Sequence, residues 1–208
     1  MRWCAGWRHL VVKIVAETER LRLRTWNDDD EFRFFEVMNT PAVMRWLGGK
    51  QTAEEWSAGY QRLRRYQRDY GFTFWIVERK ADRQILGFCG LKRANAPGAD
   101  ALAGEVEVGW RLREDAWGRG YAKEAAIASL DLAFGRFGAR QVVAVTAAGN
   151  APSQGLMKRL GMQRRCELDF VDQRFAVDHD VNPQVVFTIE ATEWPVAREL
   201  ALDSSRRS

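Results

Sequence analysis

The sequence predicts a single mixed α/β domain, and three patterns indicate that class. Hydrophobic and polar residues alternate over 105–113, and a glycine turn with a helix-forming run at 122–132 follows, which is typical of a strand joined to a helix. Residues 72–79 and 85–93 predict a hairpin. Residues 141–147 form the continuous apolar run of a buried central strand. A chain of 208 residues is long enough to bury a sizeable core.

The first elements follow from local signals. Residues 21–24 alternate and predict an outer strand. Acidic residues that can cap a helix stand before the segment 29–38, and we expect a helix there with Phe32, Phe35 and Met38 on one face.

Two helix starts come next. Thr40 and Pro41 are typical of an N-cap followed by proline at the first helical position. Residues 52–55 form a capping box that opens a helix to about Tyr70.

The C-terminal third continues the mixed pattern. We expect a short helix over 152–160 that ends at Gly161. Residues 162–171 and 184–192 predict the last two strands, and 199–208 a polar, frayed tail.

Composition excludes several classes of protein. Apolar content of 46% and charged content of 29% are ordinary for a globular chain. The net charge of +4 comes from scattered basic residues, so no nucleic-acid partner is expected. Cys4, Cys89 and Cys166 are an odd number without metal-ligand spacing, which predicts reduced thiols and a cytoplasmic location. No apolar run approaches the roughly 20 residues of a membrane span, so no membrane partner is expected.

The glycine turn is a candidate phosphate site. Gly118 and Gly120 allow a tight turn, and a helix that starts there directs unpaired N–H groups and partial positive charge at a ligand. The sequence lacks G-x-x-x-x-G-K-[ST], and Lys123 stands where a dinucleotide fingerprint needs Gly or Ala.

Four motifs carry a resemblance to a known family. They are T-E-R-L-R-L-R at 18–24, E-V-G-W at 107–110, W-G-R-G-Y-A at 117–122, and N-A-P-S with L-G-M at 150–153 and 160–162. Together they resemble the GNAT N-acetyltransferases, specifically the RimJ/RimL branch, over about 17–194. Trp117 departs from the family's general form, which has Gln or Arg at that position.

The resemblance implies a central, mostly antiparallel sheet that is flanked by helices and splayed between its fourth and fifth strands, at 105–113 and 141–147. It also divides the chain into an N-terminal extension (1–16), an acetyltransferase domain (17–194) and a C-terminal tail (195–208). The extension has a short apolar run that Lys13 interrupts, which argues against a signal peptide.

The resemblance further implies acetyl-CoA as cosubstrate and no metal. The pantetheine arm would contact Trp110, Arg111, Leu112, Asn150 and Ser153. The pyrophosphate would contact the loop residues Trp117, Gly118, Arg119, Gly120, Tyr121, Ala122 and Lys123.

Glu107 is the candidate general base, because a primary amine is mostly protonated at neutral pH. Glu105, two residues earlier, is the reserve candidate. By resemblance Ser153 hydrogen-bonds to the departing thiolate. The structural alternatives are a solvated or salt-bridged sheet face for the two carboxylates, a helix N-cap for Asn150, and a bond from Ser153 to its own helix backbone.

Other reactive residues favour structural interpretations. His9 and His179 are the only histidines, and the sequence around His179 predicts a solvated turn rather than a metal site. Cys89, within a strand, is interpreted as a buried structural thiol.

The expected function is acetyl-CoA-dependent N-acetylation of a primary amine, by a monomer or homodimer. The acceptor is a protein N-terminus or a small molecule, in a groove between the helical segment 30–60 and the segment 170–180. Asp169, Asp172 and Asp178 there could attract a cationic amine. The alternative is a non-catalytic acyl-CoA-binding or sensor protein with the same fold.

Overall fold

The computed structural model describes residues 12–206, and an eight-stranded sheet runs through them in the order β1-β2-β3-β4-β5-β6-β8-β7. The strands are β1 (Ile14–Glu17), β2 (Leu21–Arg24), β3 (Phe74–Arg79), β4 (Ile85–Arg93), β5 (Val106–Leu112), β6 (Gln141–Ala147), β7 (Gln163–Arg164) and β8 (Gln184–Glu190). All neighbouring pairs are antiparallel except β5 and β6.

The sheet is splayed between β5 and β6. These strands are parallel and pair at two positions, Val106 with Val142 and Glu107 with Val143. Beyond Glu107 the rest of β5 has no ladder partner on that side among the described residues. The mostly antiparallel sheet with an opening between the strands at 105–113 and 141–147 is confirmed.

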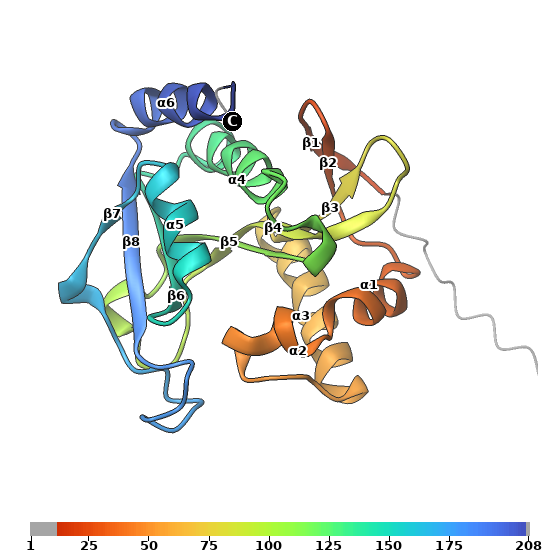
Figure 1. Ribbon diagram of the computed structural model, residues 1–208, viewed down its shortest axis with the longest axis horizontal. Coiled ribbons are helices and arrows are strands. Elements are labelled where there is room, and N and C mark those ends of the chain that lie inside the picture. The colour runs from red at the N-terminus through yellow and green to blue at the C-terminus, as the bar shows by residue number, and fades with distance from the viewer. Residues whose placement is uncertain (1–11, 207–208) are drawn as a thin grey trace, which may run out of the picture.

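Helices cover both faces of the sheet. They are α1 (Asp30–Met38), α2 (Pro41–Met44), α3 (Ala53–Tyr70), α4 (Tyr121–Asp131), α5 (Ala151–Arg159) and α6 (Trp194–Arg206). Figure 1 shows α1, α2 and α3 on one side of β3, β4 and β5, and α4 on the other. Short 3-10 turns at Arg45–Leu47 and Glu114–Ala116 follow α2 and β5.

Alternation along the strands builds two cores. Phe88 of β4 packs with Phe34 and Trp56 on the side of α1 and α3, whereas its neighbour Cys89 packs on the side of α4. Successive strand residues point to opposite faces, so β5 presents Glu107, Gly109 and Arg111 to the α1–α3 side.

A buried ion network ties α1 to the sheet. Arg24 of β2 donates to both carboxylate oxygens of Asp30 at 2.7 and 2.8 Å and to Glu78 of β3 at 2.9 Å. All three side chains are at most 8% exposed. Paired, hydrogen-bonded charges of this kind tolerate burial, but removing one partner leaves an uncompensated charge. No local sequence signal predicted this network.

Two local predictions were wrong in detail. In α1 the buried residues are Asp30, Phe34 and Met38, whereas Phe32 is 67% exposed. The buried residues are four positions apart, whereas the predicted ones are three apart. Over two turns, a spacing of four stays closer to one face of the helix than a spacing of three. The strand expected over 162–171 shortens to β7, and a 3-10 turn at Cys166–Leu168 interrupts it.

The expected frayed tail is instead helix α6. Trp194 and Ala201 are 4% and 1% exposed, and Trp194 Nε1 donates to Asp131 Oδ1 of α4 at 2.9 Å. Arg198 Nε also donates to Asp131, at 2.8 Å. Helix α6 therefore packs on the domain through Trp194, Arg198 and Ala201, while Val196 and Leu200 stay exposed.

Part of the segment that we expected to be an N-terminal extension forms a strand. Strand β1 begins at Ile14 and pairs with β2, so residues 14–16 belong to the sheet. Cys4, His9 and the rest of 1–11 lie outside the described residues. Between residues 12 and 206, no helix has both the length and the apolar character that a membrane span requires.

Candidate active site

The glycine turn forms the N-terminus of α4. Gly118 and Gly120 have φ of 71° and 78°, a left-handed conformation that side chains disfavour. Gly120 occupies the N-cap position and has no side chain to cap the helix. The first turn of α4 therefore leaves backbone N–H groups available to an anion. A Cβ at Gly118 would meet no atom within 4 Å, so the turn is open on that side.

Basic side chains surround this turn. Arg119 is exposed, and the pKa of Lys123 is lowered, first by burial and then by the charge of Arg159. A bound anion would relieve the repulsion between Lys123 and Arg159.

Glu124 fixes the start of α4 against the β1–β2 hairpin. Its carboxylate accepts from the Thr18 hydroxyl at 2.5 Å, from Arg20 N at 2.8 Å and from Arg20 Nε at 2.7 Å. Arg20 Nη1 also donates to the carbonyl of Arg119 at 3.0 Å. The sequence motifs did not predict these hydrogen bonds, because the residues that they join are about a hundred positions apart in the chain.

Trp117 fixes the other side of the turn. Its indole Nε1 donates to the carbonyl of Leu112 at 2.7 Å, while the side chain is 50% exposed. The residue that departs from the family's Gln or Arg thus ties the end of β5 to the glycine turn.

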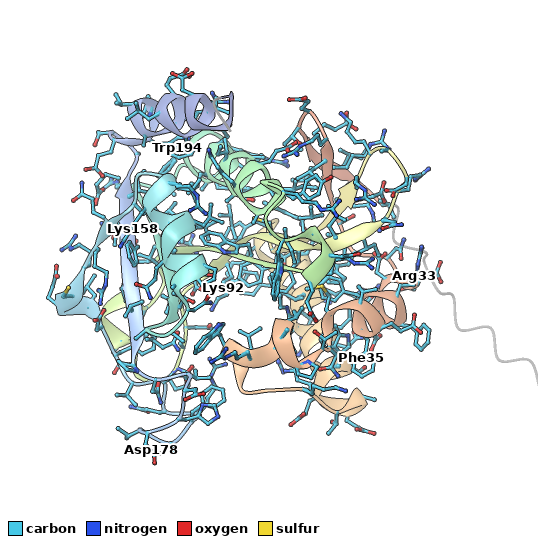
Figure 2. The ribbon with its side chains drawn as sticks, viewed as in Figure 1. Arg33, Phe35, Lys92, Lys158, Asp178 and Trp194 are labelled. Carbon is cyan, nitrogen blue, oxygen red and sulfur yellow. The ribbon has the colours of Figure 1, made fainter. Side chains whose placement is uncertain are left out.

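Glu107 lies in β5 directly opposite Lys92 of β4. The Lys92 Nζ–Glu107 Oε2 distance is 2.9 Å, and the Glu107 side chain is 13% exposed. Burial raises the pKa of Glu107 above its ordinary value, although Lys92 and, more weakly, Arg174 oppose the shift. A raised pKa brings a carboxylate closer to the range in which it exchanges protons at neutral pH. The ion pair with Lys92 also agrees with the structural alternative, in which Glu107 is part of a salt-bridged sheet face. Figure 2 shows Lys92 near the centre of the molecule, whereas Asp178 marks the tip of the loop before β8.

Glu105 is placed less favourably. Strand β5 begins at Val106, so the expectation that Glu105 lies within the strand was wrong. Its side chain is exposed. Its backbone carbonyl accepts from Ala94 N at 2.8 Å. This hydrogen bond closes the loop between β4 and β5.

Asn150 and Ser153 open α5 at the far side of the splay. Asn150 Oδ1 accepts from Ser153 N at 3.4 Å, and Asn150 Nδ2 donates to Thr146 Oγ1 at 2.9 Å, so the N-cap interpretation of Asn150 holds. Trp110 Nε1 donates to Ser153 Oγ at 3.3 Å. This bond brings β5 and α5 together across the opening and leaves the hydroxyl proton of Ser153 able to donate.

The predicted residues thus divide between the two faces of β5. Glu107 and Arg111 point to the α1–α3 side, while Trp110 and Leu112 alternate with them and point to the α4 side. A group bound in the splay would have the carboxylate on one side and Ser153 on the other.

Two ring contacts cover the α1–α3 side of the splay. A side chain at Gly149 would meet the ring of Trp46 at 2.7 Å, and one at Gly48 would collide with the ring of Phe175. The segment after α2 therefore contacts both the β6–α5 turn and the loop before β8.

The acidic residues of that loop are engaged with arginines. Asp172 is 2% exposed and pairs with Arg174 at 2.5 Å. Asp169 pairs with Arg164. Neither carboxylate is presented to the groove as a free attractor for a cation, whereas Asp178 is exposed at the loop tip.

The remaining reactive side chains have structural environments. Cys89 is fully buried with its Sγ 3.4 Å from Ser129 Oγ, and burial raises the pKa of its thiol to about 12. His179 Nδ1 accepts from Val181 N at 3.1 Å within a turn. In the described part of the chain no three His, Cys, Asp or Glu side chains gather as metal ligands.

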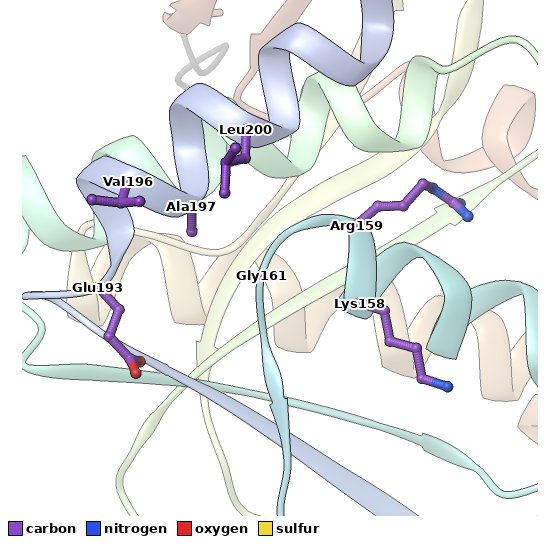
Figure 3. A pocket seen from close by; sticks show the side chains of 7 residues that line it. All are labelled: Lys158, Arg159, Gly161, Glu193, Val196, Ala197 and Leu200. Atoms are coloured by element: carbon purple, nitrogen blue, oxygen red, sulfur yellow. The ribbon is translucent and has the colours of Figure 1, made fainter.

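A shallow cavity of about 520 Å³ lies elsewhere, between the end of α5 and α6 (Figure 3). Its lining residues are Lys158, Arg159, Gly161, Glu193, Val196, Ala197 and Leu200. None of the predicted site residues contributes to it.

Comparison with known proteins gives consistent matches. Residues 20–163 match the acetyltransferase (GNAT) domain family. The chain is 32% identical over 149 residues to the uncharacterized protein YkkB of Bacillus subtilis, which covers 70% of this chain and 83% of YkkB. It is 36% identical over 149 residues to the uncharacterized N-acetyltransferase YnaD of the same organism, with coverage of 71% and 81%.

Solved structures share the fold. A GCN5-related N-acetyltransferase from Brucella melitensis aligns with a TM-score of 0.70 and 21% identity, over 92% of this chain and 84% of that one. A proposed ribosomal-protein-serine acetyltransferase from Vibrio cholerae aligns with a TM-score of 0.63 and 19% identity, over 84% and 95%. At such identities the likeness concerns the fold alone, so the RimJ/RimL branch stays a prediction.

Proposed function

Because this chain belongs to the GNAT acetyltransferase family, we propose that it is an N-acetyltransferase that transfers an acetyl group from acetyl-CoA to a primary amine by direct attack. The observation that carries this proposal is the splay between β5 and β6, with an open glycine turn and a helix N-terminus at one end. An elongated, phosphate-bearing thioester fits that combination of an unpaired strand edge and an anion site.

Each part of the site has a role in this proposal. The N–H groups at the start of α4 hold the pyrophosphate, and Arg119 and Lys123 add positive charge. The free edge of β5 over 108–112 pairs with the pantetheine amides, and one of its N–H groups polarises the thioester carbonyl, an oxyanion-type role.

Glu107 accepts the amine proton, directly or through water. The C–N bond then forms, the C–S bond breaks, and the electron pair leaves on the thiolate sulfur. Ser153 donates a hydrogen bond to that thiolate from the opposite face of β5, which stabilises the leaving group.

For the acceptor, the contacts of Trp46 with Gly149 and of Phe175 with Gly48 favour a small amine over a protein N-terminus. In this proposal the amine approaches Glu107 beside these rings, which leave less room for a polypeptide than for a small molecule.

Thiol release from acetyl-CoA, measured across a panel of small amines and N-terminal peptides, tests the proposal. Amine-dependent release with an acetylated product of the correct mass is expected. Calorimetric binding of acetyl-CoA without turnover of any amine would favour the non-catalytic alternative, and absence of binding would reject the site.

A further inference from the structure

Arg111 is a largely buried cation that has no charged partner within residues 12–206. It lies in β5 on the same face as Glu107. Its Nη1 contacts the sulfur of Met44 at 3.1 Å, and its Nε is buried with no hydrogen-bond partner. A thioether is a weak acceptor, so the guanidinium is left poorly satisfied.

Aromatic rings, not carboxylates, surround this group. The guanidinium carbon lies 4.7 Å from the ring centre of Phe88, 5.3 Å from Trp56 and 5.8 Å from Phe34. Within residues 12–206 no carboxylate lies within 4.0 Å of it. Burial alone lowers the pKa of Arg111 to about 10, with no opposing charge to raise it.

Arg24 provides the contrast within the same protein. It is also buried, yet it meets Asp30 and Glu78 with three charge-assisted hydrogen bonds. Cation–π contacts stabilise Arg111 in part, but a buried guanidinium normally has a hydrogen-bonded anion. Within residues 12–206, such anions contact Arg24 and none contacts Arg111.

The free edge of Arg111 has a defined shape. Because Nη1 faces Met44, the side-on edge formed by Nε and Nη2 remains, and this edge fits a planar carboxylate through two parallel hydrogen bonds. Glu107 and Arg111 are four residues apart on one face, which is about 13 Å along the strand. Both side chains lie on the face of β5 that α1 and α3 cover.

We propose that Arg111 binds a carboxylate on the acceptor, so that the substrates are small amino acids whose amine lies toward Glu107. This inference rests on the proposed acetyltransferase function. Because Nε is buried, side chains packed around the guanidinium must move when the carboxylate enters.

The test compares matched amines with and without the carboxylate. Glycine, 4-aminobutanoate and 6-aminohexanoate are assayed against methylamine, propylamine and pentylamine, with thiol release from acetyl-CoA as the readout. We expect kcat/KM to favour at least one acid over its matched amine by tenfold or more. Equal or better turnover of all three alkylamines by the wild type would overturn the proposal without any variant.

Variants of Arg111 test whether this residue causes the preference for the amino acid. Arg111→Met should raise KM for the preferred amino acid by tenfold or more, and kcat/KM for that amino acid should fall at least fivefold further than kcat/KM for the matched alkylamine. Arg111→Lys, which keeps the charge but lacks the two-donor edge, should fall between. The matched control is Arg113→Met, because Arg113 already pairs with Asp115 at 2.6 Å, and it should change neither substrate. Equal losses for acid and alkylamine in a variant that still binds acetyl-CoA would show a purely structural arginine.

A binding measurement separates this inference from the proposed function. Calorimetry of 4-aminobutanoate and of butanoate with the protein saturated with coenzyme A needs no turnover. Binding that Arg111→Met abolishes would support the carboxylate site even if no amine were acetylated. Turnover of amines without any acid preference would support the enzyme and reject the carboxylate site.

Discussion

Replacing Glu107 by Gln removes a base but keeps its shape. The carboxylate lies in β5 with 13% exposure and contacts Lys92 at 2.9 Å. General bases contribute typically about 10²–10⁴-fold, so we expect the rate at pH 7 to fall by about 10²-fold or more. Acetyl-CoA affinity should stay nearly unchanged, because the glycine turn begins more than ten residues later.

The pH dependence should show which group takes the proton. The pKa of Glu107 is raised, so wild-type activity should rise with pH as this carboxyl ionises, above the range of an ordinary glutamate. The rate of the Glu107→Gln variant lacks this dependence and should follow only the neutral fraction of the amine. For an amine of pKa about 8, the neutral fraction grows from about a tenth at pH 7 to about nine tenths at pH 9, so roughly tenfold of the loss should return.

Stability should move in the opposite direction from activity. A carboxyl whose folded pKa is raised stabilises the fold below its unfolded pKa, and that contribution is lost as pH rises through the folded pKa. Above the folded pKa of Glu107 its charged form is therefore unfavourable, and in that range Glu107→Gln should not lower the melting temperature. Lys92→Met is the companion variant. It removes the cation that holds the Glu107 pKa down, so the acidic limb should shift to higher pH.

The assay is the pH–rate profile of Glu107→Gln, Lys92→Met and Glu105→Gln on any accepted amine. Glu105→Gln should match the wild type, because its side chain is exposed outside the strand. A wild-type profile for Glu107→Gln would refute the carboxylate mechanism. A large loss in Glu105→Gln alone would exchange the two roles.

Three further results are expected. Gly120→Glu places bulk and negative charge at a left-handed N-cap, so calorimetry should show acetyl-CoA affinity at least about tenfold weaker; equal affinity in a folded variant would remove the turn from the site. Cys89, with its thiol pKa raised to about 12, should resist iodoacetamide at pH 8 in the folded protein while exposed Cys166 reacts, as peptide mass spectrometry would show. Asp30→Ala leaves Arg24 with one carboxylate partner, Glu78, and should cost about 3–5 kcal/mol of unfolding free energy in urea titration. A change below about 1 kcal/mol would contradict the importance of the network.

The sequence predicted elements whose signals are local. The limits of β4 and β6 agree with the expected strands, and the capping box at Thr52 and Glu55 is present as predicted. Such features depend on residues within one turn or one strand, so a single stretch of sequence contains the cause.

Contacts between distant elements could not be predicted in the same way. The opposition of Lys92 and Glu107 depends on the β4–β5 register, and the Trp110–Ser153 bond depends on how far the splay opens. Helix α6 was missed because its charged residues resemble a solvated tail, while its packing depends on α4.

Arg111 shows the limit of what the alternation pattern predicts. Alternation in β5 suggests an apolar face and a polar face, and the polar face would ordinarily be solvated. Helices α1 and α3 cover that face instead. An arginine at a polar position of a strand with both faces covered is the signal that sequence analysis could have used.

The two-residue junction between β5 and β6 leaves an unfinished ladder inside the protein. Backbone groups on β5 beyond Glu107 have the same character as an outer sheet edge, but they are enclosed between two halves of one domain. Under the proposed function, the pantetheine arm of acetyl-CoA would pair there as a missing strand, and its binding would raise the free energy of unfolding by about 2.7 kcal/mol at a hundredfold excess over Kd. The lifetime of the protein in a cell would then follow the supply of its own acetyl donor.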